Sequence, residues 1–295
     1  MDTNCKEKLE ELRTAFEGIL QNYLDGMNFK PDILNESMKY SLVQGGKRLR
    51  PVLMFACAQM LGGKVQDVAG FALALEMIHT YSLIHDDLPA MDNDDFRRGK
   101  PSNHKKFGEG QAILAGDALL NEAYSICFSE CSKGKTYRNA AALLCKNAGA
   151  AGMVAGQAAD LFWQGREGAG KAEADFILLN KTAKMIMSAV TVPACVYNAD
   201  ENIIALFSEY GKNFGFLFQI TDDILDETGD FEKLGKTIGK DKQEKKLSVL
   251  SLYGREKSEE LADHYCEICL KLLNEMPYES GFLQALTQSV RRREA

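Results

Sequence analysis

Five aspartates stand within ten residues of one another in the segment HDDLPAMDNDD, at positions 86, 87, 92, 94 and 95. Asp86 and Asp87 end a stretch that is otherwise apolar, where an unpaired carboxylate is costly. Pro89 stops a helix, so Asp92 follows in a turn and can fold back toward Asp86. A bound cation would offset the repulsion between these carboxylates, which makes Asp86 and Asp92 candidate metal ligands. A solvated acidic loop is the alternative interpretation.

A second acidic cluster stands in FQITDDILDETGD, where Asp222 and Asp226 are four residues apart on one helical face with Gln219 nearby. Neither cluster has the alternating ligands, central glycine and terminal glutamate of an EF-hand, which disfavours a dedicated calcium site. Magnesium prefers octahedral oxygen ligands and is usually held by one or two carboxylates together with substrate phosphates. Asp222 is therefore a third candidate ligand, and the expected ion is Mg²⁺.

Basic residues accompany both acidic clusters in the segments QGGKRLRP, RRGKPSNH, LLNKTAK and KLGKTIGKD. These residues are Lys47, Arg48, Arg50, Arg97, Arg98, Lys181 and Lys236. In a chain of net charge −7, cations gathered next to metal ligands indicate a polyanionic ligand such as diphosphate. Any one of these lysines alone would more often be a solvated surface charge, so the prediction depends on their joint positions.

The composition and the periodicity favour an all-α fold. Hydrophobic residues make up 45% of the 295 positions and charged residues 26%, which is typical of a globular protein, and only 6 residues are proline. Long segments have helical period, and no run of four to eight β-branched residues predicts a strand. Helices are expected at 2–24, 31–44, 51–61, 65–87, 109–132, 136–163, 173–197, 201–227, 243–253, 256–275 and 281–292. The break at 166–172 is short, so one domain over 1–295 is expected.

Two of these helices, 65–87 and 201–227, are apolar nearly all round and should form the interior of a bundle. Each ends in carboxylates, so each predicts a pocket wall with an acidic rim. His79 lies two turns before Asp86 on the same face, where it is either a ligand contact or a hydrogen-bonded core residue. Small residues at Gly211 and Gly215 indicate a close helix contact or a cavity, and Gly152 and Gly156 indicate a tight helix crossing.

Several functional classes are disfavoured. The acidic balance argues against a nucleic-acid ligand. The charged segment MDTNCKEKLEELRTAFEG lacks the apolar core of a signal peptide, and the long uncharged segment at 148–159 is too short to cross a bilayer. A cytosolic protein without a membrane span is therefore expected. Cys266 and Cys269 form one Cys-x-x-Cys pair, which more often marks two helix positions than a metal or redox site.

Six motifs, taken together in their order, resemble those of a known protein family over nearly the whole chain. They are GGKRLRP, DDLPAMD, RRGKPSNH, NKT, FQITDDILD and LGKTIGKD. The chain resembles the polyprenyl synthetase family of trans-prenyltransferases and is most similar to its bacterial farnesyl diphosphate synthases. The resemblance implies a helical bundle around a deep central cavity, with the two Asp motifs facing each other across its mouth. It implies condensation of isopentenyl diphosphate with dimethylallyl and then geranyl diphosphate, in a cytosolic homodimer. One departure is Ala183–Lys184, where many relatives have Gly and no Lys.

The resemblance also implies a role for each motif residue. Three magnesium ions would be held by Asp86, Asp92 and Asp222, with Asp87, Asp223 and Asp226 acting mainly through water. Isopentenyl diphosphate would be held by Lys47, Arg50, His79 and Arg98. The allylic substrate would be contacted by Arg97, Lys181, Thr182, Gln219 and Lys236, and dipoles of Lys181, Thr182 and Gln219 would stabilise the allylic cation. Tyr81, about 7.5 Å down the helix from Asp86, and its neighbour Ser82 would limit the product to C15.

Four alternatives stay open at this level. A geranylgeranyl diphosphate synthase would share every motif and differ in product length. A non-catalytic subunit of a prenyltransferase assembly usually loses one Asp motif, whereas this chain has both. A terpene cyclase would have no use for a second diphosphate site at Lys47–Arg50, so incorporation of isopentenyl diphosphate distinguishes it. A structural or metal-buffering bundle is the fourth alternative. If the chain is the enzyme, Asp86→Ala or Asp222→Ala should abolish turnover while helical circular dichroism stays near wild type, and retained turnover in both would contradict the metal role.

Overall fold

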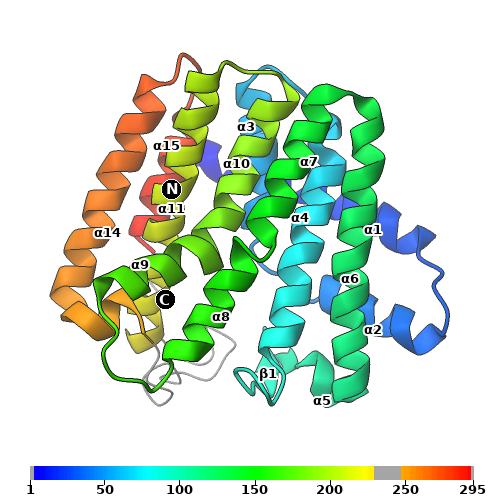
Figure 1. The fold of residues 1–295 in the computed structure, drawn as a ribbon. Helices are drawn as coiled ribbons and strands as arrows, with labels where there is room; N and C mark the ends of the chain where they lie inside the picture. The colour runs from blue at the N-terminus through cyan, green and yellow to red at the C-terminus, as the bar shows by residue number, and fades with distance from the viewer. Residues whose placement is uncertain (1–2, 229–246, 294–295) are drawn as a thin grey trace.

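The computed structural model describes residues 3–228 and 247–293, which are almost entirely helical (Figure 1). The first half contains α1 (Thr3–Gly26), α2 (Asp32–Leu42), α3 (Leu49–Met60), α4 (Val65–Asp86), α5 (Asn103–Phe107) and α6 (Glu109–Glu130). The second half contains α7 (Lys135–Ala148), α8 (Met153–Trp163), α9 (Lys171–Ile177), α10 (Lys184–Val196), α11 (Glu201–Thr228), α14 (Val249–Glu275) and α15 (Gly281–Arg291). Two short strands, β1 (Phe96–Arg97) and β2 (Lys100–Pro101), pair as an antiparallel hairpin. The predicted all-α fold is confirmed.

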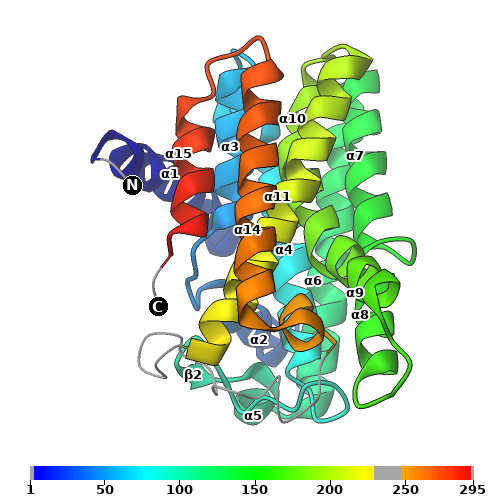
Figure 2. The same ribbon diagram turned by 90° about the vertical axis from the view of Figure 1, so that its left-hand side faces the viewer.

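The helices pack side by side around an apolar interior (Figures 1 and 2). Helix α4 packs against α3, α6 and α10, and α11 packs against α10 and α14. Large side chains such as Phe55, Phe71 and Phe214 are fully buried between them; burial of one such side chain stabilises the fold by about 1.5–3 kcal/mol. Helices α4 and α11 both end at the same end of the bundle, where the hairpin lies beside α4 (Figure 1). Two acidic helix ends are thereby brought to one place.

Helix α4 is apolar because it lies in the core. Among the described helices, α4 alone is long and apolar enough to cross a membrane by length and composition. However, 67% of its most apolar 18-residue stretch is buried inside the protein. Its interior positions, among them Leu75 and Ile78, have no exposed surface. A helix that is apolar all round and covered by neighbouring helices is typical of the centre of a large bundle. Packing against neighbouring helices therefore explains why α4 is apolar nearly all round.

Two predicted helices are interrupted, and a third break falls close to where the sequence predicts one. The predicted helix 136–163 is wrong as one element, because the chain leaves the helix between α7 and α8. Gly152 there has backbone angles of −141° and −124°, and a Cβ on it would lie 1.9 Å from the Asn147 carbonyl oxygen. The predicted helix 173–197 contains a π-helical segment, Leu178–Ala183, between α9 and α10. Helix α14 has a non-helical residue, Gly254, at φ 75°, close to the predicted break between 253 and 256.

The small residues of α8 and α11 allow close helix contacts. A Cβ on Gly156 would lie 2.1 Å from the backbone nitrogen of Lys181, and one on Gly215 would lie 2.6 Å from the Cα of Ala183. A Cβ on Gly211 would approach the Cα of Met187 to 2.7 Å. Close contact, rather than a cavity, therefore explains these glycines. The π-helical segment is clamped between α8 and α11, and Ala183 is accommodated because Gly215 has no side chain.

Candidate active site

A cavity of about 1140 Å³ opens at the end of the bundle where α4 and α11 terminate. The predicted metal-binding, substrate-binding, catalytic and chain-length residues in the described part of the chain all line it, whereas Asp87, predicted to act through water, does not. The predicted residues that line it are Lys47, Arg50, His79, Tyr81, Ser82, Asp86, Asp92, Arg97, Arg98, Lys181, Thr182, Gln219 and Asp222. Lys236 lies outside the described residues. The predicted deep central cavity is thus present, and residues more than 170 positions apart in the sequence share its walls.

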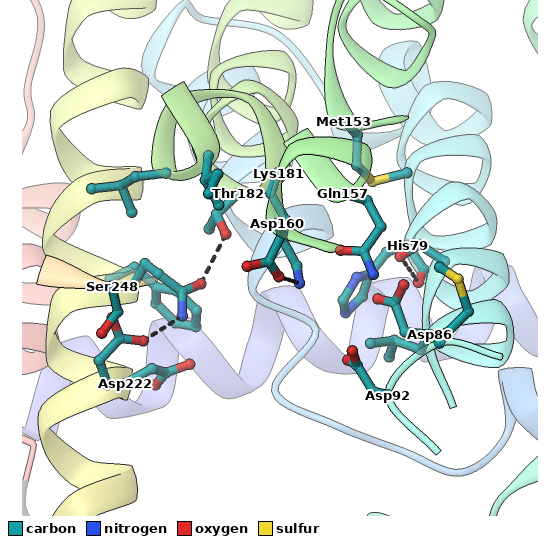
Figure 3. Close-up of a pocket in the computed structure, with 18 of the residues that line it drawn as sticks. His79, Asp86, Asp92, Met153, Gln157, Asp160, Lys181, Thr182, Asp222 and Ser248 are labelled. Atoms are coloured by element: carbon teal, nitrogen blue, oxygen red, sulfur yellow. Dashed lines mark hydrogen bonds and ion pairs between the residues drawn. The ribbon is translucent and has the colours of Figure 1, made fainter. Parts of the chain in front are cut away.

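The first acidic cluster folds as its sequence predicts. The Asp92 backbone N–H donates to the Asp86 carbonyl oxygen at 2.8 Å, so the turn after α4 brings Asp92 back beside Asp86 (Figure 3). Burial raises the pKa of Asp86 to about 7, an effect that Lys181 opposes and Asp92 reinforces. Both carboxylates lie at the C-terminal end of α4, where the helix dipole adds further negative potential. The site is therefore built to receive positive charge.

Asp87 points away from the cavity and positions Arg97. The Arg97 guanidinium donates from Nε to Asp87 Oδ1 at 3.0 Å and also pairs with Asp94 at 3.5 Å. Burial raises the pKa of Asp87 to about 6, and the hydrogen bond from Arg97 opposes this rise. Asp87 is almost completely buried. Its visible role is to hold an arginine at the cavity wall.

The second acidic cluster faces the first across the cavity. In Figure 3, Asp222 projects from α11 on one side, and Asp86 and Asp92 project from the end of α4 on the other. Asp223 and Asp226 also line the cavity. The Asp222 carboxylate accepts a hydrogen bond from Arg293 at 2.8 Å, and the Arg293 guanidinium lies 5.6 Å from the centre of the Phe218 ring. The sequence analysis did not single out Arg293.

The carboxylates suit magnesium by their chemistry and spacing. Their oxygen atoms are hard ligands, and the buried Asp86 needs a neighbouring positive charge to ionise fully at neutral pH. Across 3–228 and 247–293, no three or more His, Cys, Asp or Glu side chains gather closely enough to hold a metal unaided. Sparse carboxylates on opposite walls leave coordination positions for water and substrate phosphate, as magnesium requires. Asp86, Asp92 and Asp222 therefore fit Mg²⁺ bound together with a phosphorylated ligand.

Arg48 and Arg50, at the start of α3, have different roles. Arg48 is buried and pairs with Glu76 at 2.7 Å and Glu17 at 2.8 Å, so it ties α3 to α4 and α1. Arg50 faces the cavity, and its buried Nε has no hydrogen-bond partner among the described residues. Arg98 lies against Gly46 and donates to the Gly45 carbonyl oxygen. An unsatisfied guanidinium beside a second arginine is a ready anion site.

His79 lies in this basic part of the wall. Burial lowers the pKa of His79 well below its usual value, and the nearby charges of Arg50 and Arg98 lower it further. The imidazole is therefore neutral at physiological pH and contributes a hydrogen bond rather than a charge to any ligand. Its location on the cavity wall, near Gln157 and Asp86 (Figure 3), makes ligand contact possible.

A hydrogen-bonded chain runs from the π-helical segment to α11. Thr182 Oγ1 donates to Gln219 Oε1 at 2.8 Å, and Gln219 Nε2 donates to Asp223 Oδ1 at 2.8 Å. Lys181 Nζ donates to Asp160 Oδ2 at 2.5 Å (Figure 3). Single-turn π-helical segments occur often at functional sites. Lys181, Thr182 and Gln219 are thus brought together as predicted, with their side chains held by defined partners.

Two cavity residues on α8 were missed by sequence reasoning. Gln157 and Asp160 line the cavity, and Asp160 is buried where it holds Lys181. In their segment, AGMVAGQAAD, the glycines predict only a tight helix crossing. The available signal was two polar residues three apart, on one face of a helix that is otherwise small and apolar. Gly156, between them in sequence, gives α8 the close approach to Lys181 described above.

Tyr81 and Ser82 belong to the α4 wall. Tyr81 is buried and its ring meets the His85 ring edge-on, with 5.7 Å between ring centres. Burial raises the pKa of Tyr81 to about 12, with smaller contributions from Tyr124 and Asp86. The Ser82 hydroxyl donates to the His79 carbonyl oxygen at 2.9 Å. Tyr81 therefore presents bulk to the cavity one turn before Asp86, and Ser82 is small and internally bonded.

Comparison with known proteins agrees with this geometry. The sequence matches the family described as polyprenyl synthetase over residues 31–274. A farnesyl diphosphate synthase of Micrococcus luteus is 42% identical over 87% of this chain and 88% of its own length. A chloroplastic geranylgeranyl pyrophosphate synthase of Capsicum annuum is 43% identical over 79% of this chain and 64% of its own length.

Solved structures give the same result. A geranyltransferase from Helicobacter pylori, solved as a complex with magnesium and isoprenyl diphosphate, superposes with a TM-score of 0.84. It is 29% identical, and the match covers 99% of this chain and 98% of that chain. The fold, the cavity with its facing acidic helix ends and the family match over most of the sequence lead to one conclusion. This chain belongs to the polyprenyl synthetase family.

Proposed function

We propose that this chain, as a single polyprenyl synthetase domain, condenses isopentenyl diphosphate with dimethylallyl diphosphate and then with geranyl diphosphate, giving farnesyl diphosphate. One observation carries the proposal. Asp86 and Asp222 lie on opposite walls of one cavity (Figure 3), and Arg50 and Arg98 also line this cavity. Two anion sites with different chemistry suit a reaction that brings two diphosphates together. The farnesyl diphosphate synthases among the relatives support the same reaction.

Ionisation of the allylic substrate comes first in this reaction. Breaking the C–O bond places negative charge on the leaving diphosphate, and preorganised positive groups stabilise that charge more in the transition state than in the ground state. Magnesium held by Asp86, Asp92 and Asp222 would supply Lewis-acid stabilisation of the diphosphate oxygens; three ions is the number that the family resemblance implies. Arg97, held by Asp87, and Lys181, held by Asp160, add fixed charges.

Carbon–carbon bond formation follows. Lys47, Arg50 and Arg98 would hold the diphosphate of isopentenyl diphosphate, with His79 as a neutral hydrogen-bonding partner. The double bond of this substrate attacks C1 of the allylic cation, and the resulting cation loses a proton to the released diphosphate. Apolar cavity residues such as Met153, Leu178 and Phe218 keep water from capturing either cation.

Product length is assigned to Tyr81 with its neighbour Ser82. The buried ring of Tyr81 stands one turn deeper than Asp86, so the growing chain reaches it after a few isoprene units. Geranylgeranyl diphosphate is the second candidate product, because geranylgeranyl pyrophosphate synthases are among the relatives, at 43% and 44% identity. A ring at the floor favours the shorter C15 chain.

The assembly and the location are part of the proposal. Three apolar side chains of α6 are exposed to solvent, with exposed fractions of 44% for Ile113, 53% for Leu114 and 83% for Phe128. Exposed apolar side chains commonly lie in an interface with another protein. We assign this face to a homodimer. Cys5, Cys57 and the other described cysteines are free thiols, which suits a reducing cytosol.

Product analysis tests the function. The purified protein, given dimethylallyl diphosphate, isotope-labelled isopentenyl diphosphate and Mg²⁺, should form a C15 diphosphate that contains two labelled units. A labelled C20 product would select the second candidate. An allylic substrate that ionises to an unlabelled hydrocarbon would select a cyclase, and no reaction of either substrate would contradict the proposal.

A further inference from the structure

The side-chain amide of Gln157 is buried in the cavity wall without a partner. In the part of the chain that the structure describes, neither Oε1 nor Nε2 of Gln157 has a hydrogen bond, although both atoms are shielded from solvent. Leaving one buried polar group unsatisfied typically costs about 1–3 kcal/mol. Because native proteins avoid this cost, the amide indicates a ligand that completes its hydrogen bonding.

The position of Gln157 indicates which part of a ligand it meets. Figure 3 shows its amide between His79 and Asp86 on one side and the Asp160–Lys181 pair on the other. Met153 lies one helical turn away on the same α8 wall, beyond the amide (Figure 3). Gln157 therefore stands where the charged mouth of the cavity gives way to its apolar interior.

The cavity has many donors for a diphosphate, and the carboxylates at its mouth are assigned to magnesium, so few uncharged side-chain acceptors remain for a cation among the described residues. Arg50, Arg97 and Arg98 already supply N–H groups at the mouth. On the opposite wall, the Gln219 carbonyl oxygen already accepts from Thr182, and the Gln219 amide nitrogen donates to Asp223. The Gln157 carbonyl oxygen has both lone pairs available, and a rotation of the amide by 180° costs it no existing bond.

We propose that Gln157 is a further catalytic residue, whose amide oxygen contacts the allylic carbons of the substrate and stabilises the positive charge that develops there on ionisation. The inference rests on the proposed prenyl transfer. It deepens that function by placing an acceptor on the α8 wall, across from the Thr182–Gln219 pair. A fixed dipole aimed at developing charge in a water-excluded site acts mainly on the transition state.

Three variants test this role in the full-length protein. Gln157→Met removes both polar atoms at similar volume, Gln157→Glu keeps an acceptor oxygen, and Gln21→Met changes an exposed helical glutamine as a control. The readouts are kcat and KM for geranyl and isopentenyl diphosphates, and the midpoint of thermal unfolding without ligand.

Gln157→Met should lower kcat by about tenfold or more with KM for both substrates within about twofold, and Gln157→Glu should retain more activity than Gln157→Met. The unfolding midpoint of Gln157→Met should equal or exceed that of the wild type, because two unsatisfied polar atoms are gone. An unchanged kcat, equal losses in both variants, or a lower midpoint that accompanies the lost activity would overturn the inference. If neither the wild-type protein nor the Gln21→Met variant forms product, the proposed function itself is contradicted.

Discussion

Arg293 donates a hydrogen bond to Asp222 at 2.8 Å, so the chain returns to the mouth of the cavity two residues after α15 ends. The contact joins positions 71 residues apart in the sequence. A guanidinium here occupies the space beside a carboxylate that we assign to magnesium. The arginine and a bound metal would therefore compete for Asp222 Oδ1.

Replacement of Arg293 tests this competition. Arg293→Ala should lower the Mg²⁺ concentration for half-maximal activity by about two- to fivefold, because a partly exposed ion pair contributes up to about 1 kcal/mol. The same variant should show a larger rise in thermal midpoint when Mg²⁺ and inorganic diphosphate are added together. Arg292→Ala, at an exposed neighbouring position, is the control. A higher Mg²⁺ requirement in Arg293→Ala would contradict the competition.

The floor of the cavity is tested by shortening one side chain. Tyr81→Ala removes the ring that stands before Asp86, so the product should lengthen beyond C15. Tyr81→Phe keeps the buried ring and removes only the hydroxyl, so it should still give C15. Chromatography of the products from both variants is the measurement. A C15 product from Tyr81→Ala would remove Tyr81 from this role.

His79 makes a prediction about stability and pH. Its pKa in the folded protein lies well below the usual value of about 6.5, so below that pH the unfolded chain binds more protons than the folded one. The contribution of the neutral His79 imidazole to the free energy of unfolding is fully present above about pH 6.5 and falls as the pH decreases below that value. The charged groups around the imidazole are Arg48, Arg50, Arg97 and Arg98.

His79→Gln should therefore lose less thermal stability than the wild type between pH 7 and pH 5.5. Scanning calorimetry at several pH values measures the difference. His264→Gln, at an exposed histidine of α14, should follow the wild-type curve. Parallel curves for His79→Gln and the wild type would show that the imidazole is not held neutral by the fold.

The exposed face of α6 predicts the effect of one added charge. Phe128 is 83% exposed in the single chain, and burying a carboxylate at an interface is unfavourable. Phe128→Asp should weaken a homodimer by about 30-fold, the effect of losing a contact worth about 2 kcal/mol. Light scattering after size-exclusion chromatography, across a dilution series, measures it. A wild-type protein that is monomeric throughout would rule out the dimer.

Local patterns in the sequence were sufficient for several parts of the site. The apolar stripes that end at Asp86 and Asp226 predicted two central helices with acidic ends, and Pro89 predicted the turn that returns Asp92 to Asp86. Helical periodicity describes which residues share a face, and these residues are close together in the chain. The family resemblance added the roles of residues whose positions are fixed by tertiary structure.

Other features depend on packing that no local pattern encodes. Arg48 and Arg50 are two residues apart with the same side chain, yet Arg48 pairs with Glu17 and Glu76 while Arg50 faces the cavity. Arg293 reaches Asp222 only because α15 packs against α11. The chain leaves the helix at Gly152, where a Cβ would meet the backbone of Asn147, and a helical period does not reveal this break.

The central claim is that Asp86 and Asp222 act on one diphosphate from opposite walls. The most direct measurement is the Mg²⁺-dependent rate of diphosphate release from the allylic substrate, in the presence of isopentenyl diphosphate, for Asp86→Asn, Asp222→Asn and the double variant. Each single change should lower the rate by about 10³-fold or more, the equivalent of about 4 kcal/mol, with helical circular dichroism unchanged. The double variant should be no slower than the slower single variant, because groups that act as a unit are not additive. A near-wild-type rate in either folded single variant would contradict the claim.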